Sequence, residues 1–379
     1  MIPFLGARCP SAGDIRKFDV LDKLFENASL SKDWQRSPFG QSQASLLTQR
    51  GERELYLLGK RSRKRYSKFW SNITYDANVV EFKSTQVSRY SVIDRKRTSP
   101  VRTIGDCLLH GLAHGLRDIR RDNVTAGIHT LQASDEELLM HHACPLWTAT
   151  VENSSVLKEQ VEIYIHTHLS KIARRISNQL GIRPPLEAIH AEHIYRACSY
   201  AVTYSGRIDT WCSLLEEEDF LKLEYLHDMI KYYGFSYGSP LNARMACQFY
   251  TGLVKSVDDF LDGKSSIKSM MKFAHAETII FLTTILGLFK DDYPLDADRF
   301  YRSKSRKFRT SKIAPFASNI YFEIYNCTDN YESTIFIQML VNEKPVVIPG
   351  CVYTFCSWDR FKQLLGSNIG CDFDEMCKL

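Results

Sequence analysis

Apolar residues along the chain follow a strand period near its two ends and a helix period through its middle. Short apolar runs predict strands at positions 78–83, 319–325, 334–340 and 346–348. Apolar residues recur at helical spacing over positions 156–180, 189–202, 219–233 and 242–261, and again over 358–365. The pattern therefore predicts an α/β protein with an all-α block in its middle.

The helical block divides the chain into three segments. We expect residues 118–261 to form an α-helical cap domain, because an all-α block between two halves of an α/β domain is typical of a cap over a site. The strands that follow the block are expected to return to the first sheet. Residues 1–117 and 262–379 would then build one α/β domain from both ends of the chain, and 379 residues suffice for this arrangement.

A polar corner interrupts the apolar pattern at residues 270–278. A short apolar segment leads into His275 and Glu277, and a helix is expected to begin there with Thr278 as its cap. The end of a strand followed by the start of a helix suits an anion, because free N–H groups and the positive end of the helix dipole meet there. The histidine would meet the charge of a phosphate and the carboxylate would handle a proton. Alone, a His-x-Glu pair is more often a surface pair, so this interpretation needs a partner elsewhere.

Composition narrows the classes of function. The chain has 49 Lys and Arg against 44 Asp and Glu, and a net charge of +5 is too slight to indicate nucleic acid binding. We interpret the basic clusters at 61–65 and 95–102 as solvated faces, and strongly salt-dependent binding of DNA or RNA would contradict this. No apolar run reaches about 18 residues, so no membrane span is predicted.

Cysteines and glycosylation sequons favour the secretory pathway. The chain has 11 cysteines, and two short loops suit disulfides, Cys198 with Cys212 and Cys371 with Cys377. Five Asn-x-Ser/Thr sequons begin at Asn27, Asn72, Asn123, Asn153 and Asn326. Against this, residues 1–5 lack the charged and apolar regions of a signal peptide. Either the chain is cytosolic or its true beginning is missing.

Clustered histidines raise the question of a metal site. The candidates are His110, His114, His141, His142 and the nearby Cys144. A structural zinc site needs four ligands at a defined spacing, and no second pair stands at a matching distance from these. We therefore expect no metal and no other cofactor.

The order of several short motifs resembles that of the histidine acid phosphatases. The motifs are Gly6-Ala7-Arg8-x-Pro10, Leu47-Thr48-x-x-Gly51, Arg65-Tyr66, Ser84-Thr85-x-x-x-Arg89 and His275-Ala276-Glu277-Thr278. The His-Ala-Glu form, with the stretches 288–291 and 306–319, is similar to the multiple inositol polyphosphate phosphatase branch. This resemblance covers nearly the whole chain. It implies a phosphoglycerate-mutase-like central sheet with flanking helices and an inserted α-helical cap.

The resemblance also implies roles for individual residues. Arg8 and Arg89 would clamp the phosphate, His275 would stabilise its developing charge, and Glu277 would protonate the leaving alcohol. An insertion at 90–101 makes Arg102 a substitute for Arg89, but we prefer Arg89, because Ser-Thr-x-x-x-Arg directly after a strand is the better match. The implied substrates are inositol polyphosphates such as phytate, with bisphosphoglycerate as a further candidate. These small phosphate esters are the expected partners, and the oligomeric state is left open.

The chain departs from the family signature at its two central positions. The signature is Arg-His-Gly-x-Arg-x-Pro, and here Phe4 and Leu5 stand where the first arginine and the nucleophilic histidine belong. Leu5 cannot form a phosphoenzyme, and Phe4 removes a fixed positive charge. Either the chain is an inactive relative that binds phosphate esters, or a mis-joined first exon has replaced the signal peptide and the Arg-His pair. The missing signal peptide favours the second explanation.

Overall fold

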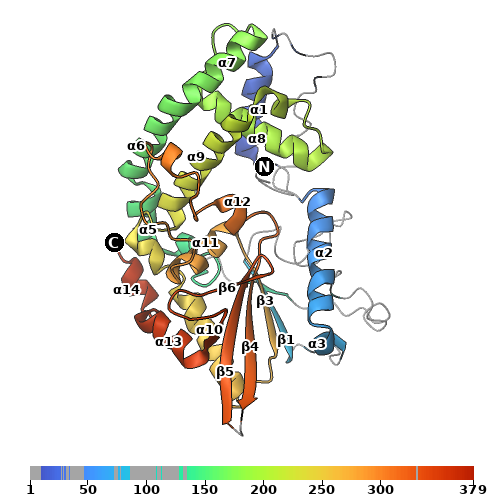
Figure 1. Cartoon of the computed structure of the whole chain (residues 1–379), viewed down its shortest axis with the longest axis vertical. Helices are drawn as coiled ribbons and strands as arrows, with labels where there is room; N and C mark the ends of the chain where they lie inside the picture. The colour runs from blue at the N-terminus through green and yellow to red at the C-terminus, as the bar shows by residue number, and fades with distance from the viewer. Residues whose placement is uncertain are drawn as a thin grey trace.

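The structure is a computed structural model, and it describes residues 10–26, 28, 30, 34, 47–71, 76, 78–85, 108, 112, 128–130, 135–329 and 332–379. A layer of helices forms one half of the molecule, and two sheets with their covering helices form the other half (Figure 1). None of the described helices is long and apolar enough to cross a membrane.

A three-stranded parallel sheet brings distant parts of the chain together. Its strands are β1 (Val80–Ser84), β2 (Ile128–Thr130) and β3 (Ser269–Phe273), in the order β2-β1-β3. Strand β1 therefore confirms the strand predicted at 78–83. Because parallel strands end at the same edge of a sheet, the residues after β1 and those after β3 meet at one place.

The strands near the carboxyl end form a separate antiparallel sheet. They are β4 (Ile320–Asp329), β5 (Glu332–Val341), β6 (Lys344–Val346) and β7 (Phe355–Ser357), and both β6 and β7 pair with β5. The expectation that these strands return to the first sheet is wrong for the described residues. The connection between β4 and β5 is too short for a crossover, and it permits only an antiparallel pair.

The helices predicted through the middle of the chain are present. They are α6 (Ser155–Tyr164), α7 (Ser170–Leu180), α8 (Ala188–Ser205), α9 (Glu217–Phe235) and α10 (Cys247–Leu261). Helices α7 and α8 both end at a glycine in the left-handed conformation, with φ of 69° at Gly181 and 73° at Gly206.

Other helices flank these elements. They are α1 (Ala12–Leu24), α2 (Gln49–Arg65), α3 (Ser67–Ser71), α5 (Pro145–Trp147), α11 (Ala276–Ile285), α12 (Thr310–Ile313), α13 (Trp358–Leu365) and α14 (Phe373–Cys377). Helix α13 matches the one predicted at 358–365. The short helices are η2 (Met140–Ala143), η3 (Thr148–Glu152), η4 (Ile165–Leu169), η5 (Trp211–Leu214), η6 (Pro240–Ala243), η7 (Phe300–Arg302) and η8 (Gly366–Asn368).

Two large hydrophobic cores hold the helices and the antiparallel sheet together, and a smaller third core packs α3 against the parallel sheet. One lies among α1, α7, α8 and α9 and includes the fully buried Leu21, Ile176 and Leu223. The other lies among α10, α11, α13 and the antiparallel sheet and includes Phe281 and Met339. Helix α1 thus packs against the middle helices and α10 against the carboxyl-terminal sheet. The domain boundaries at 117 and 261 stay a prediction.

Four disulfides cross-link the described part of the chain. They join Cys144 to Cys377, Cys198 to Cys212, Cys247 to Cys371 and Cys351 to Cys356. The predicted Cys198–Cys212 bond is confirmed. The predicted Cys371–Cys377 bond is wrong, because α14 carries Cys377 to the start of α5, while Cys371 lies against α10.

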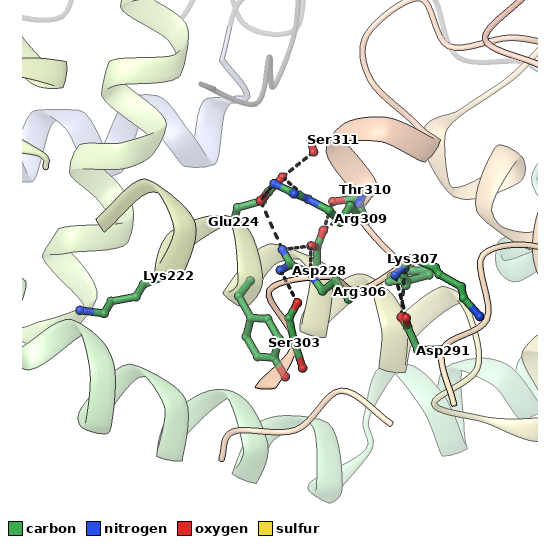
Figure 2. Close-up of polar contacts among 12 residues, drawn as sticks. Lys222, Glu224, Asp228, Asp291, Ser303, Arg306, Lys307, Arg309, Thr310 and Ser311 are labelled. Atoms are coloured by element: carbon green, nitrogen blue, oxygen red, sulfur yellow. Dashed lines mark hydrogen bonds and ion pairs between the residues drawn. The ribbon is translucent and has the colours of Figure 1, made fainter. Parts of the chain in front are cut away.

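A buried ion cluster joins α9 to the segment 303–313 (Figure 2). The Arg306 guanidinium donates to Asp228, with Nε 2.8 Å from Oδ2, and also contacts Glu224 at 3.3 Å. The backbone N–H of Thr310 donates to Asp228 Oδ1 at 2.7 Å. Arg309 also pairs with Glu224. Burial raises the pKa of Asp228 to about 6, even though Arg306 and Thr310 act to lower it.

Candidate functional site

The predicted polar corner lies between the end of β3 and the start of α11. His275 is the residue before the helix and has an extended backbone, with φ of −110° and ψ of 166°. Thr278 takes part in the helix cap as expected, but as the third helical residue and not as the residue before the helix, because the helix already begins at Ala276. Thr278 lies in the first turn, where its hydroxyl accepts from the His275 N–H at 3.3 Å and donates to the Leu138 carbonyl at 2.7 Å.

Thr85 joins His275 at the edge of the parallel sheet. Its hydroxyl oxygen lies 3.3 Å from Nε2 of His275, although the two residues are 190 positions apart in sequence. Thr85 directly follows β1 and is fully buried. This contact orients the imidazole ring, and it brings the Ser84-Thr85 motif to the histidine of the His-Ala-Glu motif.

Glu277 forms an ion pair with a residue that the sequence analysis did not identify. Lys231 of α9 places its Nζ atom 2.6 Å from Oε1 of Glu277. The same Nζ lies 4.5 Å from the centre of the Phe235 ring. Burial alone would raise the pKa of Glu277, but the charge and hydrogen bond of Lys231 outweigh burial and lower the pKa to about 2. The Glu277 carboxyl group is therefore ionised at ordinary pH when no ligand is bound.

A second histidine lies behind the corner. His141 of η2 is buried, and its ring contacts Trp147 at 5.2 Å and Phe281 at 5.8 Å between centroids. Burial and the neighbouring His142 lower the pKa of His141 to about 4, whereas the Glu277 charge opposes this shift. His141 is thus a neutral imidazole at ordinary pH. Within the described residues no group of three or more His, Cys, Asp or Glu is arranged to hold a metal ion.

The structure brings two of the predicted site residues together, and the others lie outside the residues that it describes. His275 and Glu277 share the corner as the motif predicted. Phe4, Leu5, Arg8, Arg89 and Arg102 lie outside the described residues, so their places at the site stay predictions.

An open cleft lies on the side of the parallel sheet. It is lined by charged residues of both signs from β1, β3, α10 and the turn at 135–137, among them Lys83, Lys272 and Glu137, and Lys272 pairs with Glu137. Neither His275 nor Glu277 lines this cleft. We place the candidate site at the corner, because groups with shifted pKa values gather there around a helix start.

The fold and the corner agree with one protein family. The sequence model of the histidine phosphatase superfamily (branch 2) matches residues 6–342. The chain therefore belongs to this superfamily.

Comparison with individual proteins relates the chain to one branch of this superfamily. The chain is 28% identical over 260 residues to multiple inositol polyphosphate phosphatase 1 of Gallus gallus, an alignment that covers 66% of this chain and 58% of that protein. The resemblance to this branch is confirmed. The chain thus spans less than two thirds of the length of this relative.

Two solved structures share the fold. The phytase from D. castellii superposes with a TM-score of 0.74 at 16% identity, over 98% of this chain and 79% of that one. The Bifidobacterium longum multiple inositol polyphosphate phosphatase, in complex with inositol hexasulfate, superposes with a TM-score of 0.69 at 14% identity, over 97% and 86%. The predicted fold class, an α/β histidine-phosphatase fold with a helical part, is confirmed.

Proposed function

We propose that this chain binds phosphate monoesters of the inositol polyphosphate class at the corner of His275 and Glu277. The observation that carries the proposal is the convergence of Thr85, His275, Glu277 and Lys231 from three separate parts of the chain. The start of α11 adds the positive end of a helix dipole. The names of the relatives support this class of ligand.

The family chemistry is hydrolysis through a phosphohistidine. In that scheme His275 stabilises the charge on the transferring phosphoryl group, and Glu277 gives a proton to the leaving alcohol. Arg8 and Arg89, or Arg102 in its place, bind the phosphate oxygens as the motifs imply. No metal or cofactor takes part in this proposal.

Leu5 favours binding without turnover for the chain as written. A leucine offers no lone pair to attack phosphorus, and losing the nucleophile of a covalent enzyme lowers turnover roughly a millionfold. The alternative function is hydrolysis of phosphate esters at the rate of active family members. It requires the Arg-His pair that Phe4 and Leu5 replace.

A pair of assays on the purified chain tests both forms. Calorimetric titration with phytate measures binding, and release of inorganic phosphate measures turnover. We expect saturable binding and no release above the buffer rate. Absence of saturable binding would refute the proposed site. Release at family-like rates that Glu277→Gln does not reduce would refute the site assignment.

We also propose that the chain follows the secretory pathway. The four disulfides of the described residues support this, since such bonds persist in oxidising compartments. The sequon residues Asn153 and Asn326 are both exposed. When a secreting cell makes the chain, treatment with an N-glycosidase should lower its apparent mass. No change would argue against export.

A further inference from the structure

Lys231 lies beside the candidate site and belongs to no motif of the family signature. It is on α9, whereas Glu277 is in the first turn of α11. Side-chain exposures are 32% for Lys231 and 25% for Glu277, so solvent and a ligand both reach this ion pair. Beyond Glu277, the ammonium contacts the face of Phe235 on its own helix.

The ion pair conflicts with the role proposed for Glu277. A group that protonates a leaving alcohol must itself carry a proton, and the pairing with Lys231 holds this carboxyl group in its ionised form. Some event on ligand binding must therefore weaken the pair. An incoming phosphate ester is itself an anion that competes for the same ammonium.

Lys231 is suited to such an exchange. A lysine ammonium is a compact charge with three hydrogen-bond donors on a flexible stem, so it can turn from one anion to another without movement of the helix. A phosphate monoester offers more negative charge and more acceptor oxygens than one carboxylate. The half-exposed position leaves room for this side-chain rotation.

We propose that Lys231 is a phosphate ligand that changes partners. It pairs with Glu277 in the free protein and binds a phosphate oxygen of the ester when the ester enters. Its departure lets Glu277 take up a proton, which an active member of the family would pass to the leaving alcohol. The inference rests on the proposed function and names a further binding residue for it.

The proton balance of this step is simple. One proton passes from solvent to the Glu277 carboxylate, Lys231 stays protonated, and no covalent bond changes. The other titratable groups facing Glu277 are His275 at the start of α11 and His141 of η2. Burial keeps His141 neutral above about pH 4, so it does not replace the charge that Lys231 removes.

Calorimetric titration with inositol hexasulfate tests the exchange. The sulfate esters do not titrate near pH 5.5, so proton uptake measured in two buffers of different ionisation enthalpy comes from the protein. We expect uptake approaching one proton in the unmodified chain. Lys231→Met should weaken binding roughly 10- to 100-fold, the value of a charge-assisted hydrogen bond, and should reduce the uptake.

A second variant distinguishes a lysine that changes partners from an ion pair that only stabilises the fold. Glu277→Gln frees Lys231 for the ligand, so its affinity should equal or exceed that of the unmodified chain, with the proton uptake reduced by the share of Glu277. Lys222→Met is the matched control, because Lys222 is on the same helix about 13 Å away along the axis and pairs with the exposed Glu218. Its binding should be unchanged.

The outcomes distinguish the inference from the function on which it rests. If the unmodified chain does not bind inositol hexasulfate, the proposed function fails. If it binds and Lys231→Met binds equally well, or if Glu277→Gln weakens binding as much as Lys231→Met, the inference fails. Lys231→Gln, which retains hydrogen-bond donors, serves if the methionine variant does not fold, and it should show the same loss of affinity.

Discussion

Arg306→Met should destabilise the protein strongly, and more at pH 8 than at pH 5. The guanidinium is 4% exposed and lies between Glu224, at 6%, and Asp228, at 0%. Methionine fills a similar volume without the charge. The substitution therefore leaves Asp228 buried with hydrogen bonds from Thr310 as its remaining support.

The magnitude follows from the burial of these charges. Breaking a buried ion pair by removal of one partner costs about 3–5 kcal/mol of unfolding free energy. The pKa of Asp228 is about 6 in the folded protein against 3.8 for an ordinary aspartate, so the folded state binds more protons between these pH values. Stability therefore falls as the pH rises from about 4 to 6. Removal of Arg306 raises this pKa further and increases the loss above pH 6, by about 1.4 kcal/mol for each pKa unit.

Urea denaturation at pH 5 and pH 8, with the disulfides intact, measures the effect. Arg207→Met is the matched control, because Arg207 pairs at the surface with Asp209, which is 61% exposed. We expect the control to lose less than about 1 kcal/mol at both pH values. A loss below 1 kcal/mol for Arg306→Met, or an equal loss at pH 5 and pH 8, would refute the reasoning about Asp228.

Three further predictions concern the site and the disulfides. Restoring the family signature with Phe4→Arg and Leu5→His should produce phosphate release from phytate where the unmodified chain shows none. If the restored chain also releases no phosphate, the motif alignment is wrong. Glu277→Gln in that restored chain should lower kcat by roughly 10²- to 10⁴-fold, the usual loss for a general acid, as measured by initial rates. Cys377→Ala should lower the unfolding free energy more than Cys212→Ala, because their disulfides span 233 and 14 residues. The chain-entropy estimates are about 5 and about 3 kcal/mol, and equal urea midpoints would contradict the difference.

The helices could be predicted from the sequence because each has its own apolar face. The periodicity over 219–233 is a property of α9 alone, and the structure extends it only to Glu217–Phe235. Sheet membership is not a local property. The strands predicted at 319–325 and 334–340 are present as β4 and β5, but they pair with each other and with β6 and β7 in a sheet separate from the parallel one, and only tertiary packing determines that choice.

The disulfides illustrate the same limit. The Cys198–Cys212 bond closes a short loop between α8 and η5, so proximity in sequence was a sufficient guide. Cys371 and Cys377 lie even closer in sequence, yet each pairs with a cysteine more than 100 residues away. Sequence spacing alone does not determine which cysteines pair. The packing of α14 against α5 decides it here.

The candidate site shows the same difference between residues that a local motif identifies and residues that only tertiary packing brings in. The His-Ala-Glu motif predicted His275 and Glu277, because the motif is a local pattern. Lys231 could not be predicted, since it lies 46 residues before Glu277 and a lysine on a helix is usually solvated. Only the packing of α9 against α11 brings the ammonium to the carboxylate.

Helix α9 carries two kinds of ion pair that differ in how easily they exchange partners. Asp228 is fully buried and tied to Arg306 and Thr310, whereas Lys231, one turn further on, is half-exposed beside Glu277. Breaking the first pair leaves an uncompensated buried charge, and breaking the second exposes groups that water can solvate. The cluster therefore holds the helix in place while the lysine side chain moves. A ligand that draws Lys231 away from Glu277 would shift one side chain and leave α9 where it is.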